Sequence, residues 1–263
     1  MTRLLDIRDV SKSFDGPGGP KKVLDGVTFR VEEGEFVSLI GPSGSGKSTL
    51  FHMIGGLTRP TSGEIAVNGR RIDGDRGHIA YMPQQASLMP WLTVAGNIEL
   101  ALGIGGIARR EARSMARDWL KRVGLGEAAD AYPLTLSGGM QQRVSFLRAL
   151  LSPQPLMCLD EPFGALDALT RLHMQQWLLS LWEDNRRSVL LVTHSIEEAI
   201  LMSDRIVVLS ASPASVIHEV DVPFPRPRGE ELWSEPLFNK LKTEIYELLR
   251  PDDDGPGRKR ESI

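Results

Sequence analysis

The sequence predicts an α/β fold: a mainly parallel sheet, an antiparallel β subdomain beside it, and an inserted α-helical subdomain. Short apolar runs alternate with amphipathic helical patterns along the chain. β-prone segments broken by turns fill the first forty residues and the stretch 63–82, and helical patterns dominate from about residue 86. The length of 263 residues suits one large domain with an appended subdomain. We expect a domain over residues 1–230 with the helical subdomain at about 86–155, then a C-terminal helix and disordered tail over 231–263.

Buried strands are predicted where nearly every residue is apolar, because the strands of a parallel sheet are covered on both faces. The runs that fit are 36–40, 156–159, 189–193 and 206–209. A helix is predicted where apolar residues recur at i, i+3, i+4, i+7 and i+8. We expect these residues to pack in the core: Met174, Trp177, Leu178, Leu181 and Trp182.

The β-prone segments differ from these runs because turns interrupt them, at 15–20 and at 67–70. We therefore predict that the first forty residues and 63–82 form an antiparallel layer beside the parallel core. At the other end of the chain, residues 251–260 are charged and rich in glycine and proline. Such a composition predicts disorder.

Composition excludes several classes of protein. The formal net charge is −3, so the chain lacks the global basic field of many nucleic-acid-binding proteins, and we expect no nucleic-acid partner. The single cysteine, Cys158, rules out an intramolecular disulfide and fits a reducing compartment. No apolar run approaches the roughly 20 residues that cross a bilayer, and the N-terminus lacks the apolar core of a signal peptide. We therefore expect a cytosolic protein that reaches a membrane only by docking on a membrane-spanning partner.

A glycine-rich loop lies between the strand 36–40 and a helix predicted over 48–57. Its residues match G-x-x-x-x-G-K-[ST]: Gly41, Pro42, Ser43, Gly44, Ser45, Gly46, Lys47, Ser48 and Thr49. The glycines let successive backbone N–H groups point at phosphate oxygens, and the helix N-terminus adds partial positive charge. Lys47 is expected to reach the β- and γ-phosphates and Ser48 to ligate Mg²⁺. The loop predicts a P-loop nucleotidase core.

A second anion-binding helix start is predicted downstream. The segment LSGGMQQR, residues 136–143, places a hydroxyl and two glycines ahead of a helical stretch: Ser137, Gly138 and Gly139. One nucleotide needs only one phosphate cradle. The second cradle therefore suggests contact with a nucleotide that another copy of the chain holds.

Together these segments resemble the ATPase subunits of ABC transporters over roughly residues 3–225. LSGGMQQR is similar to that family's signature sequence, and it stands after the P-loop and shortly before LMCLDE, residues 156–161. The resemblance implies ATP as the nucleotide, Mg²⁺ as the cofactor and a head-to-tail dimer. In such a dimer, each ATP would lie between the P-loop of one copy and Ser137, Gly138 and Gly139 of the other.

The resemblance also implies catalytic roles for single residues. Glu161 corresponds to the general base that activates water, His194 to the histidine that contacts the γ-phosphate, and Lys47 to the catalytic lysine. Asp167 matches the loop that crosses the dimer interface. The alternatives are a helix cap for the acidic pair Asp160 and Glu161, and an ordinary structural role for His194.

Further correspondences concern the metal ion and the adenine of ATP. Asp160 resembles the carboxylate that holds Mg²⁺, and Gln84 the glutamine that helps to ligate Mg²⁺ and senses the γ-phosphate. Gln84 is preferred over Gln85 because its spacing to Pro90 fits the family. Phe14 occupies the place of an aromatic residue that stacks on adenine, where tyrosine is usual, so the π face is kept and the hydroxyl is lost. The alternatives are a polar loop residue for Gln84 and a core residue for Phe14.

Two phrases, MPWLTV at 89–94 and PFGALDALTR at 162–171, resemble the ATPases of importers for nitrate, sulfonates or taurine. The ATPases of importers for a pyrimidine precursor of thiamine have similar segments, so that precursor is the alternative substrate. The segment VPFPRPR at 222–228 also suits this group. Ser195 departs from the aspartate often found after His194, which bears on the subgroup and not on the ATPase assignment.

Such a subunit would be peripheral on the cytoplasmic side of the inner membrane. It would bind separate permease subunits and serve a substrate-binding protein indirectly. The apolar residues Leu88, Met89, Trp91 and Leu92 suit a groove for a short permease helix or, alternatively, pack inside the helical subdomain. The rival classes are soluble ABC ATPases that act on ribosomes or DNA, and inactive cassettes. The single P-loop, the lack of a heptad insertion and the full set of catalytic residues argue against them.

Overall fold

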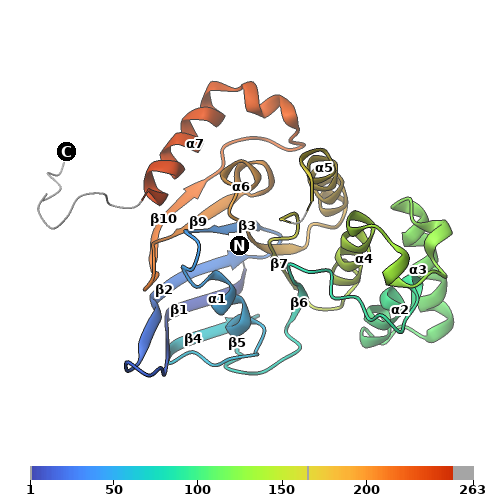
Figure 1. Cartoon of the computed structure of the whole chain (residues 1–263), viewed down its shortest axis with the longest axis horizontal. Helices are drawn as coiled ribbons and strands as arrows, with labels where there is room; N and C mark the ends of the chain where they lie inside the picture. Colours follow the sequence, from blue (N-terminus) through green and yellow to red (C-terminus); the bar gives the residue numbers. More distant parts are fainter. Residues whose placement is uncertain (1, 165, 251–263) are drawn as a thin grey trace, which may run out of the picture.

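The computed structural model describes residues 2–164 and 166–250, and in this part of the chain two sheets are covered by helices (Figure 1). The larger sheet has the order β10-β9-β3-β8-β7-β6 and the smaller one β2-β1-β4-β5. The larger sheet contains β3 (Phe36–Ile40), β6 (Ile79–Met82), β7 (Leu156–Asp160), β8 (Ser188–Val192), β9 (Arg205–Leu209) and β10 (Val216–Asp221). The smaller sheet contains β1 (Arg3–Phe14), β2 (Lys21–Glu32), β4 (Ser62–Val67) and β5 (Arg70–Arg71).

The apolar runs form the centre of the larger sheet, which confirms the prediction of a parallel core. β3, β7 and β8 are buried at all five positions. β3 pairs in parallel with β8 and β9, and β7 pairs in parallel with β6 and β8. The edge strand β10 runs antiparallel to β9. Parallel strands place their carboxyl ends at one edge of a sheet, so the loops that follow β3, β6, β7 and β8 meet there.

The predicted antiparallel layer is the smaller sheet, in which β1 pairs antiparallel with β2 and β4. One part of that prediction is wrong: β6, which lies within 63–82, belongs to the larger sheet and runs parallel to β7. Its residues alternate between half-buried and buried, a pattern that an edge strand of either sheet can show. Only its pairing with β7 shows to which of the two sheets β6 belongs.

The helices begin and end as follows: α1 (Lys47–Ile54), α2 (Val94–Ile104), α3 (Arg109–Arg122), α4 (Gly138–Leu150), α5 (Ala168–Asn185), α6 (Ile196–Met202) and α7 (Pro236–Leu249). The helix predicted over 48–57 is α1, which ends ahead of the glycine pair 55–56. α2, α3 and α4 lie between β6 and β7 in the chain and stand together, apart from α1 (Figure 1).

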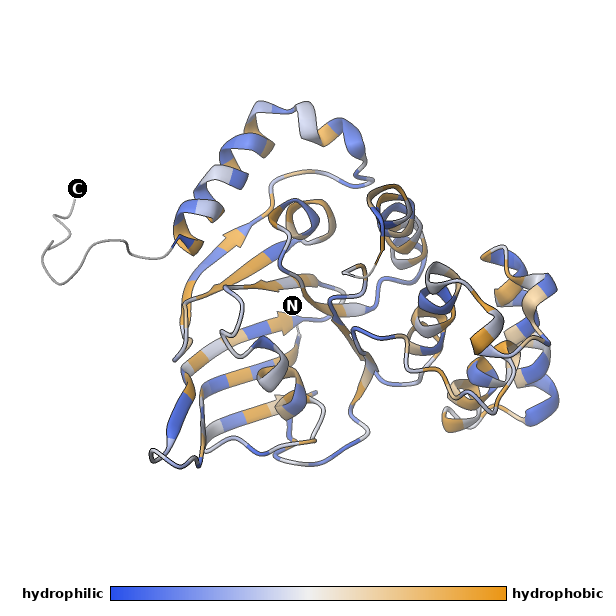
Figure 2. Ribbon diagram, viewed as in Figure 1, coloured by the Kyte–Doolittle hydropathy of each residue, from blue (hydrophilic) through white to orange (hydrophobic). Residues whose placement is uncertain are grey.

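Helix α5 shows the predicted apolar face. Met174, Leu178 and Trp182 are buried, and Trp177 and Leu181 pack against the same core. Figure 2 shows the same contrast across the molecule: strands of the larger sheet carry orange residues, whereas α3 and α7 carry long blue stretches. The core therefore lies between the sheets and the apolar faces of the helices.

The segment 222–228 anchors the C-terminal part of the chain to the end of α6 and to the residues just before β9. Arg228 is 7% exposed and donates hydrogen bonds to the carbonyl oxygens of Phe224 and Ile200 at 2.7 and 3.1 Å. Arg226 pairs with Asp204 at 2.8 Å. The predicted C-terminal helix is α7, and the predicted disordered tail from residue 251 lies outside the described residues. Among the described helices, none has both the length and the apolar character needed to span a membrane.

Candidate functional site

The P-loop, residues 41–49, connects β3 to α1. Gly44 and Gly46 have φ angles of 77° and 93°, in the left-handed region that glycine adopts without steric cost. A Cβ at Gly46 would lie 2.8 Å from Cγ1 of Val23 and 2.9 Å from Cδ2 of Leu24. Glycine is required there because β2 passes directly beside the loop.

Lys47, the first residue of α1, is enclosed by the loop. It is 7% exposed, and its Nζ donates hydrogen bonds to the carbonyl oxygens of Gly41 at 2.8 Å and Pro42 at 2.9 Å. Burial lowers the pKa of Lys47, while the negative charges of Glu161 and Asp160 oppose that shift. The ammonium group is therefore held where the loop faces the acidic pair.

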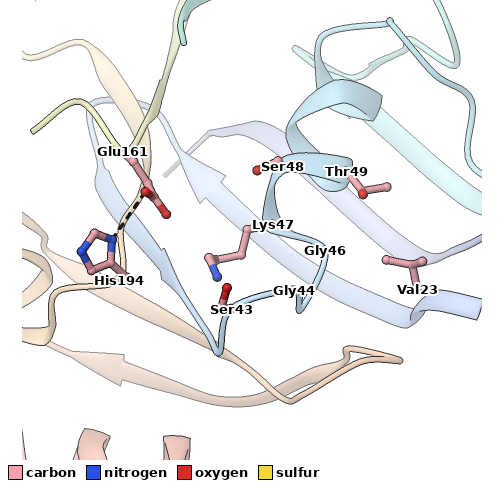
Figure 3. A pocket seen from close by; sticks show the side chains of 9 residues that line it. All are labelled: Val23, Ser43, Gly44, Gly46, Lys47, Ser48, Thr49, Glu161 and His194. Atoms are coloured by element: carbon pink, nitrogen blue, oxygen red, sulfur yellow. Dashed lines mark ion pairs between the residues drawn. The ribbon is translucent and has the colours of Figure 1, made fainter. Parts of the chain in front are cut away.

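A cavity of about 600 Å³ opens over the P-loop. Its lining includes Val23 and, from other parts of the chain, Glu161 and His194. Figure 3 shows Lys47 on the loop side and the Glu161–His194 pair across from it. The loop residues that line the cavity are Ser43, Gly44, Gly46, Lys47, Ser48 and Thr49. Pockets of a few hundred to about 1,000 Å³ are typical of small-molecule sites.

Glu161 starts the turn that follows β7, with a φ angle of 44°. This left-handed conformation is strained for a residue with a side chain, and such strain concentrates at functional sites. The N–H of Glu161 donates to the carbonyl oxygen of Val192 at 2.9 Å, which supports the turn. The alternative role of a helix cap does not hold, because α5 begins at Ala168 and Asp167 caps it.

The Glu161 carboxylate meets side chains from two other loops. Nε2 of Gln84 donates a hydrogen bond to Oε2 of Glu161 at 3.1 Å, and Nδ1 of His194 lies 3.5 Å from the same oxygen. Gln84 comes shortly after β6, and His194 comes shortly after β8. The His194 side chain is 63% exposed and lines the cavity, so it is not the buried structural histidine of the alternative reading.

Asp160, the last residue of β7, is more enclosed than Glu161. It is 8% exposed, and its Oδ2 accepts a hydrogen bond from the Tyr81 hydroxyl at 3.1 Å. Burial raises the pKa of Asp160 overall, and the hydrogen bond from Tyr81 opposes that shift. Burial and the negative charge of Asp160 both raise the pKa of Tyr81, so the phenol keeps the proton that it donates.

Asp160, Ser48 and Gln84 supply oxygen ligands, the kind that Mg²⁺ prefers. Ser48 is exposed at the cavity, Gln84 contacts Glu161, and Asp160 precedes Glu161 in the chain. Mg²⁺ that binds together with phosphates commonly uses only one or two carboxylates. The chemistry of this donor set therefore fits Mg²⁺.

Ser137, Gly138 and Gly139 stand apart from this cavity. Ser137 is the N-cap of α4, and its Oγ accepts a hydrogen bond from the N–H of Met140 at 3.4 Å. In the described part of the chain, none of the three lines the cavity over the P-loop. In Figure 1, α4 lies with α2 and α3, away from α1. Asp167, placed at the dimer interface by the resemblance, is exposed at the start of α5.

Phe14 ends β1 and is 45% exposed, so it is not the core residue of the alternative reading. The ammonium group of Lys12 lies 5.0 Å from its ring centroid. Phe14 is not among the residues that line the P-loop cavity. Stacking of Phe14 on the adenine ring of ATP stays a prediction.

The loop before α2 presents less apolar surface than the sequence suggested. Trp91 is 71% exposed, whereas Leu88, Met89 and Leu92 are half-buried. The buried side chain of Asn97 explains this: its Oδ1 accepts a hydrogen bond from the N–H of Met89 at 2.7 Å, and its Nδ2 donates to the Met89 carbonyl at 3.2 Å. These bonds hold the loop against α2 and leave Trp91 outside.

Two residues at the site were missed from the sequence. Val23 lines the cavity beside Gly46, and Tyr81 bonds Asp160. Tyr81 lies three positions before Gln84, so a polar aromatic residue close to a chosen site residue was an available signal. Val23 carried no such signal, because a valine in a strand is normally read as core.

A family model described as "ABC transporter" matches residues 24–164. Over 249 residues the chain is 41% identical to the bicarbonate transport ATP-binding protein CmpD of Synechococcus elongatus, which covers 93% of this chain and 90% of that protein. Over 252 residues it is 40% identical to the nitrate import ATP-binding protein NrtD of Synechocystis sp., and this match covers 94% of this chain and 95% of that protein. The fold matches the dimeric cassette MJ0796 solved in a post-hydrolysis state with ADP and Pi, with a TM-score of 0.73 and 33% identity, over 84% of this chain and 100% of that one.

Proposed function

The chain belongs to the ABC transporter family, and on that premise we propose that it hydrolyses ATP to energise import of a small solute through a separate permease. Two relatives are a bicarbonate transport protein and a nitrate import protein by name. These names support a solute of the nitrate, bicarbonate or sulfonate type, with taurine in the same group. We assign residues 1–230 to the ATPase domain, with the helices of about 86–155 as its inserted subdomain.

The observation that carries the proposal is the convergence of Lys47, Glu161 and His194 on one cavity. They come from three separate segments, after β3, β7 and β8. A P-loop cation binds the phosphates and a carboxylate can accept the proton of an attacking water, so this cavity suits phosphoryl transfer to water.

In this reaction, water attacks the γ-phosphorus, the bond to the β–γ bridging oxygen breaks, and ADP and phosphate leave. Glu161 accepts the proton of the attacking water, which typically contributes about 10²–10⁴-fold in rate. Lys47 and His194 donate hydrogen bonds to the phosphate oxygens, where negative charge gathers. Gln84 orients the carboxylate of Glu161 through the bond between them. Phe14 stacks on the adenine.

A bound Mg²⁺ would neutralise negative charge on the phosphates. The residues that would hold it are Ser48, Asp160 and Gln84. Tyr81 keeps the Asp160 carboxylate in place through its hydroxyl.

Two copies of the chain face each other head to tail, so that Ser137, Gly138 and Gly139 of one copy meet the nucleotide on the P-loop of the other. Their distance from their own P-loop supports this arrangement, as does the dimeric cassette of similar fold. Shifting an open–closed equilibrium from about 1:99 to 99:1 requires roughly 5.5 kcal/mol of preference for the closed form. Two bound nucleotides supply it if each contributes about half.

The dimer docks on permease subunits at the cytoplasmic side of the inner membrane, and a substrate-binding protein delivers the solute on the other side. The exposed ring of Trp91 and the exposed face of α2 that carries Leu100 and Ile104 supply apolar surface for a short permease helix. Co-purification with candidate permease subunits that are expressed together with this chain tests that contact. Its loss in Trp91→Ala is the expected result.

Replacing the proposed base tests the proposed function. In Glu161→Gln, phosphate release falls at least about 100-fold because proton transfer is lost. The variant still binds ATP and accumulates as a closed dimer, which size-exclusion chromatography detects. Glu111→Gln, the same change on the exposed face of α3, serves as the control and behaves as the unmodified chain. Normal turnover by Glu161→Gln, or a monomer in saturating ATP, would contradict the proposal.

A further inference from the structure

Helix α4 holds the segment that follows β6. Nε2 of Gln142 donates a hydrogen bond to the backbone carbonyl oxygen of Gln84 at 3.1 Å. Gln142 is 5% exposed, so the donor side chain of this bond is buried. The side chain of Gln84 in turn donates to Glu161. A residue of α4 therefore holds the backbone of the residue that contacts the proposed base.

Arg148 continues this contact farther along the same helix. Its guanidinium donates hydrogen bonds to the carbonyl oxygens of Ser87 at 2.9 Å and Ala86 at 3.3 Å. Ser87 has a φ angle of 44°, a conformation that needs support from its surroundings. Arg148 lies six positions after Gln142, which corresponds to about 9 Å along a helix. Together the two side chains brace residues 84–87 against α4.

Packing alone does not account for Gln142. Within residues 2–164 and 166–250 its Oε1 has no hydrogen-bond partner, and an unpaired buried amide oxygen costs stability. Methionine has a similar size and would avoid that cost. What the amide adds at this position is a donor that reaches the Gln84 carbonyl.

We propose that Gln142 and Arg148 are positioning residues that make the Gln84–Glu161 contact depend on the placement of α4. Gln142 lies five positions after Ser137, little more than one helical turn from the end of α4 assigned to the partner's nucleotide. Any shift of α4 on meeting that nucleotide therefore acts on the base of its own site. This inference rests on the proposed ATPase function and adds to it a link between the two sites of the dimer.

A double-mutant cycle tests whether Gln142 acts through Gln84. Phosphate release is measured for Gln84→Ala, Gln142→Met and the double variant. We expect Gln142→Met alone to lower kcat about tenfold. When Gln84→Ala is already present, adding Gln142→Met should lower kcat by less than about twofold, because the effects of coupled residues do not add. KM for ATP stays within about twofold, since the P-loop is unchanged. A purely structural role would not produce this dependence on the background.

The matched control is Gln176→Met, the same chemical change on α5, where the amide bonds Glu230 at 3.2 Å on the surface. It leaves kcat unchanged in both backgrounds. Should Gln142→Met fail to fold, Arg148→Met takes its place in the cycle, and Arg148→Lys, which keeps one donor, restores most of the rate.

Equal losses on the two backgrounds would overturn the inference, because Gln142 would then act independently of Gln84. Failure of the proposed function gives a different result: the unmodified chain releases no phosphate, and Glu161→Gln changes nothing. An active chain that depends on Glu161 but shows an additive cycle rejects only the role of Gln142.

Discussion

Gln84 and Glu161 are joined by a hydrogen bond of 3.1 Å although 77 positions separate them in the chain. They follow β6 and β7, which are neighbours in the larger sheet. The carboxyl ends of parallel strands share one edge, so side chains just beyond those ends can meet. Lys47 and His194 reach the same edge from β3 and β8, and the chemistry of the site depends on this arrangement.

Replacing Lys47 by methionine should weaken ATP binding about 10- to 100-fold, because charge-assisted hydrogen bonds contribute about 1.5–3 kcal/mol. Titration calorimetry on the Glu161→Gln background measures affinity without turnover. Lys121→Met, on the exposed side of α3, is the matched control and retains full affinity. An unchanged affinity for ATP in Lys47→Met would show that Lys47 does not contribute to nucleotide binding.

Phe14→Ala should weaken ATP binding by about 1–3 kcal/mol if the exposed ring stacks on the adenine. Phe14→Tyr, which keeps the π face, should bind within about twofold of the original. Inorganic tripolyphosphate has no base, so its affinity should be the same in all three proteins. If Phe14→Ala weakens ATP and tripolyphosphate equally, the ring supports the loop instead of the base.

Magnesium dependence tests the donor set of Ser48, Asp160 and Gln84. We expect EDTA to stop phosphate release while ATP stays bound. Ser48→Ala should raise the Mg²⁺ concentration at half-maximal rate at least about tenfold, on the scale seen when the surroundings of metal ligands are altered. Thr49→Val removes the adjacent hydroxyl and should leave that concentration unchanged. An equal shift in both variants would argue against Ser48 as a ligand.

Glu198 should make stability depend on pH. It is 5% exposed in α6 and accepts a hydrogen bond from Nε2 of Gln175 at 2.9 Å. Burial raises its pKa from the ordinary 4.5 to about 7, against the opposing bonds from Thr193 and Gln175. The folded protein thus holds this proton more tightly than the unfolded chain. The stabilisation is complete below about pH 4.5 and is lost as the pH rises through about 7.

The size of this effect is about 3 kcal/mol between the two limits. Glu198→Gln removes the titration and should flatten the decline in free energy of unfolding between about pH 5 and pH 8, measured by urea denaturation. Glu197→Gln is the matched control one position earlier. Burial acts to raise the pKa of Glu197, but its bond to Lys242 leaves it lowered, so this group loses stabilisation only at acidic pH. A steep decline that persists in Glu198→Gln would assign the pH dependence to another group.

Much of the fold could be predicted from the sequence because the signals are local. The runs that became β3, β7, β8 and β9 are short and apolar at nearly every position, as strands covered on both faces are. The apolar spacing along α5 predicted its buried face, and the P-loop was recognised from residues that act within a single turn of chain.

The sequence by itself therefore determined the buried strands, the phosphate-binding loop and the residue types of the site, since periodicity and motif spacing encode them. Only the tertiary structure decided that β6 joins the larger sheet, that Asn97 draws in the loop around Met89, and that Gln142 of α4 holds Gln84. These contacts depend on which strands become neighbours and which helix covers a loop. Strand order and helix packing are settled by the whole core at once, and no local pattern of residues records them.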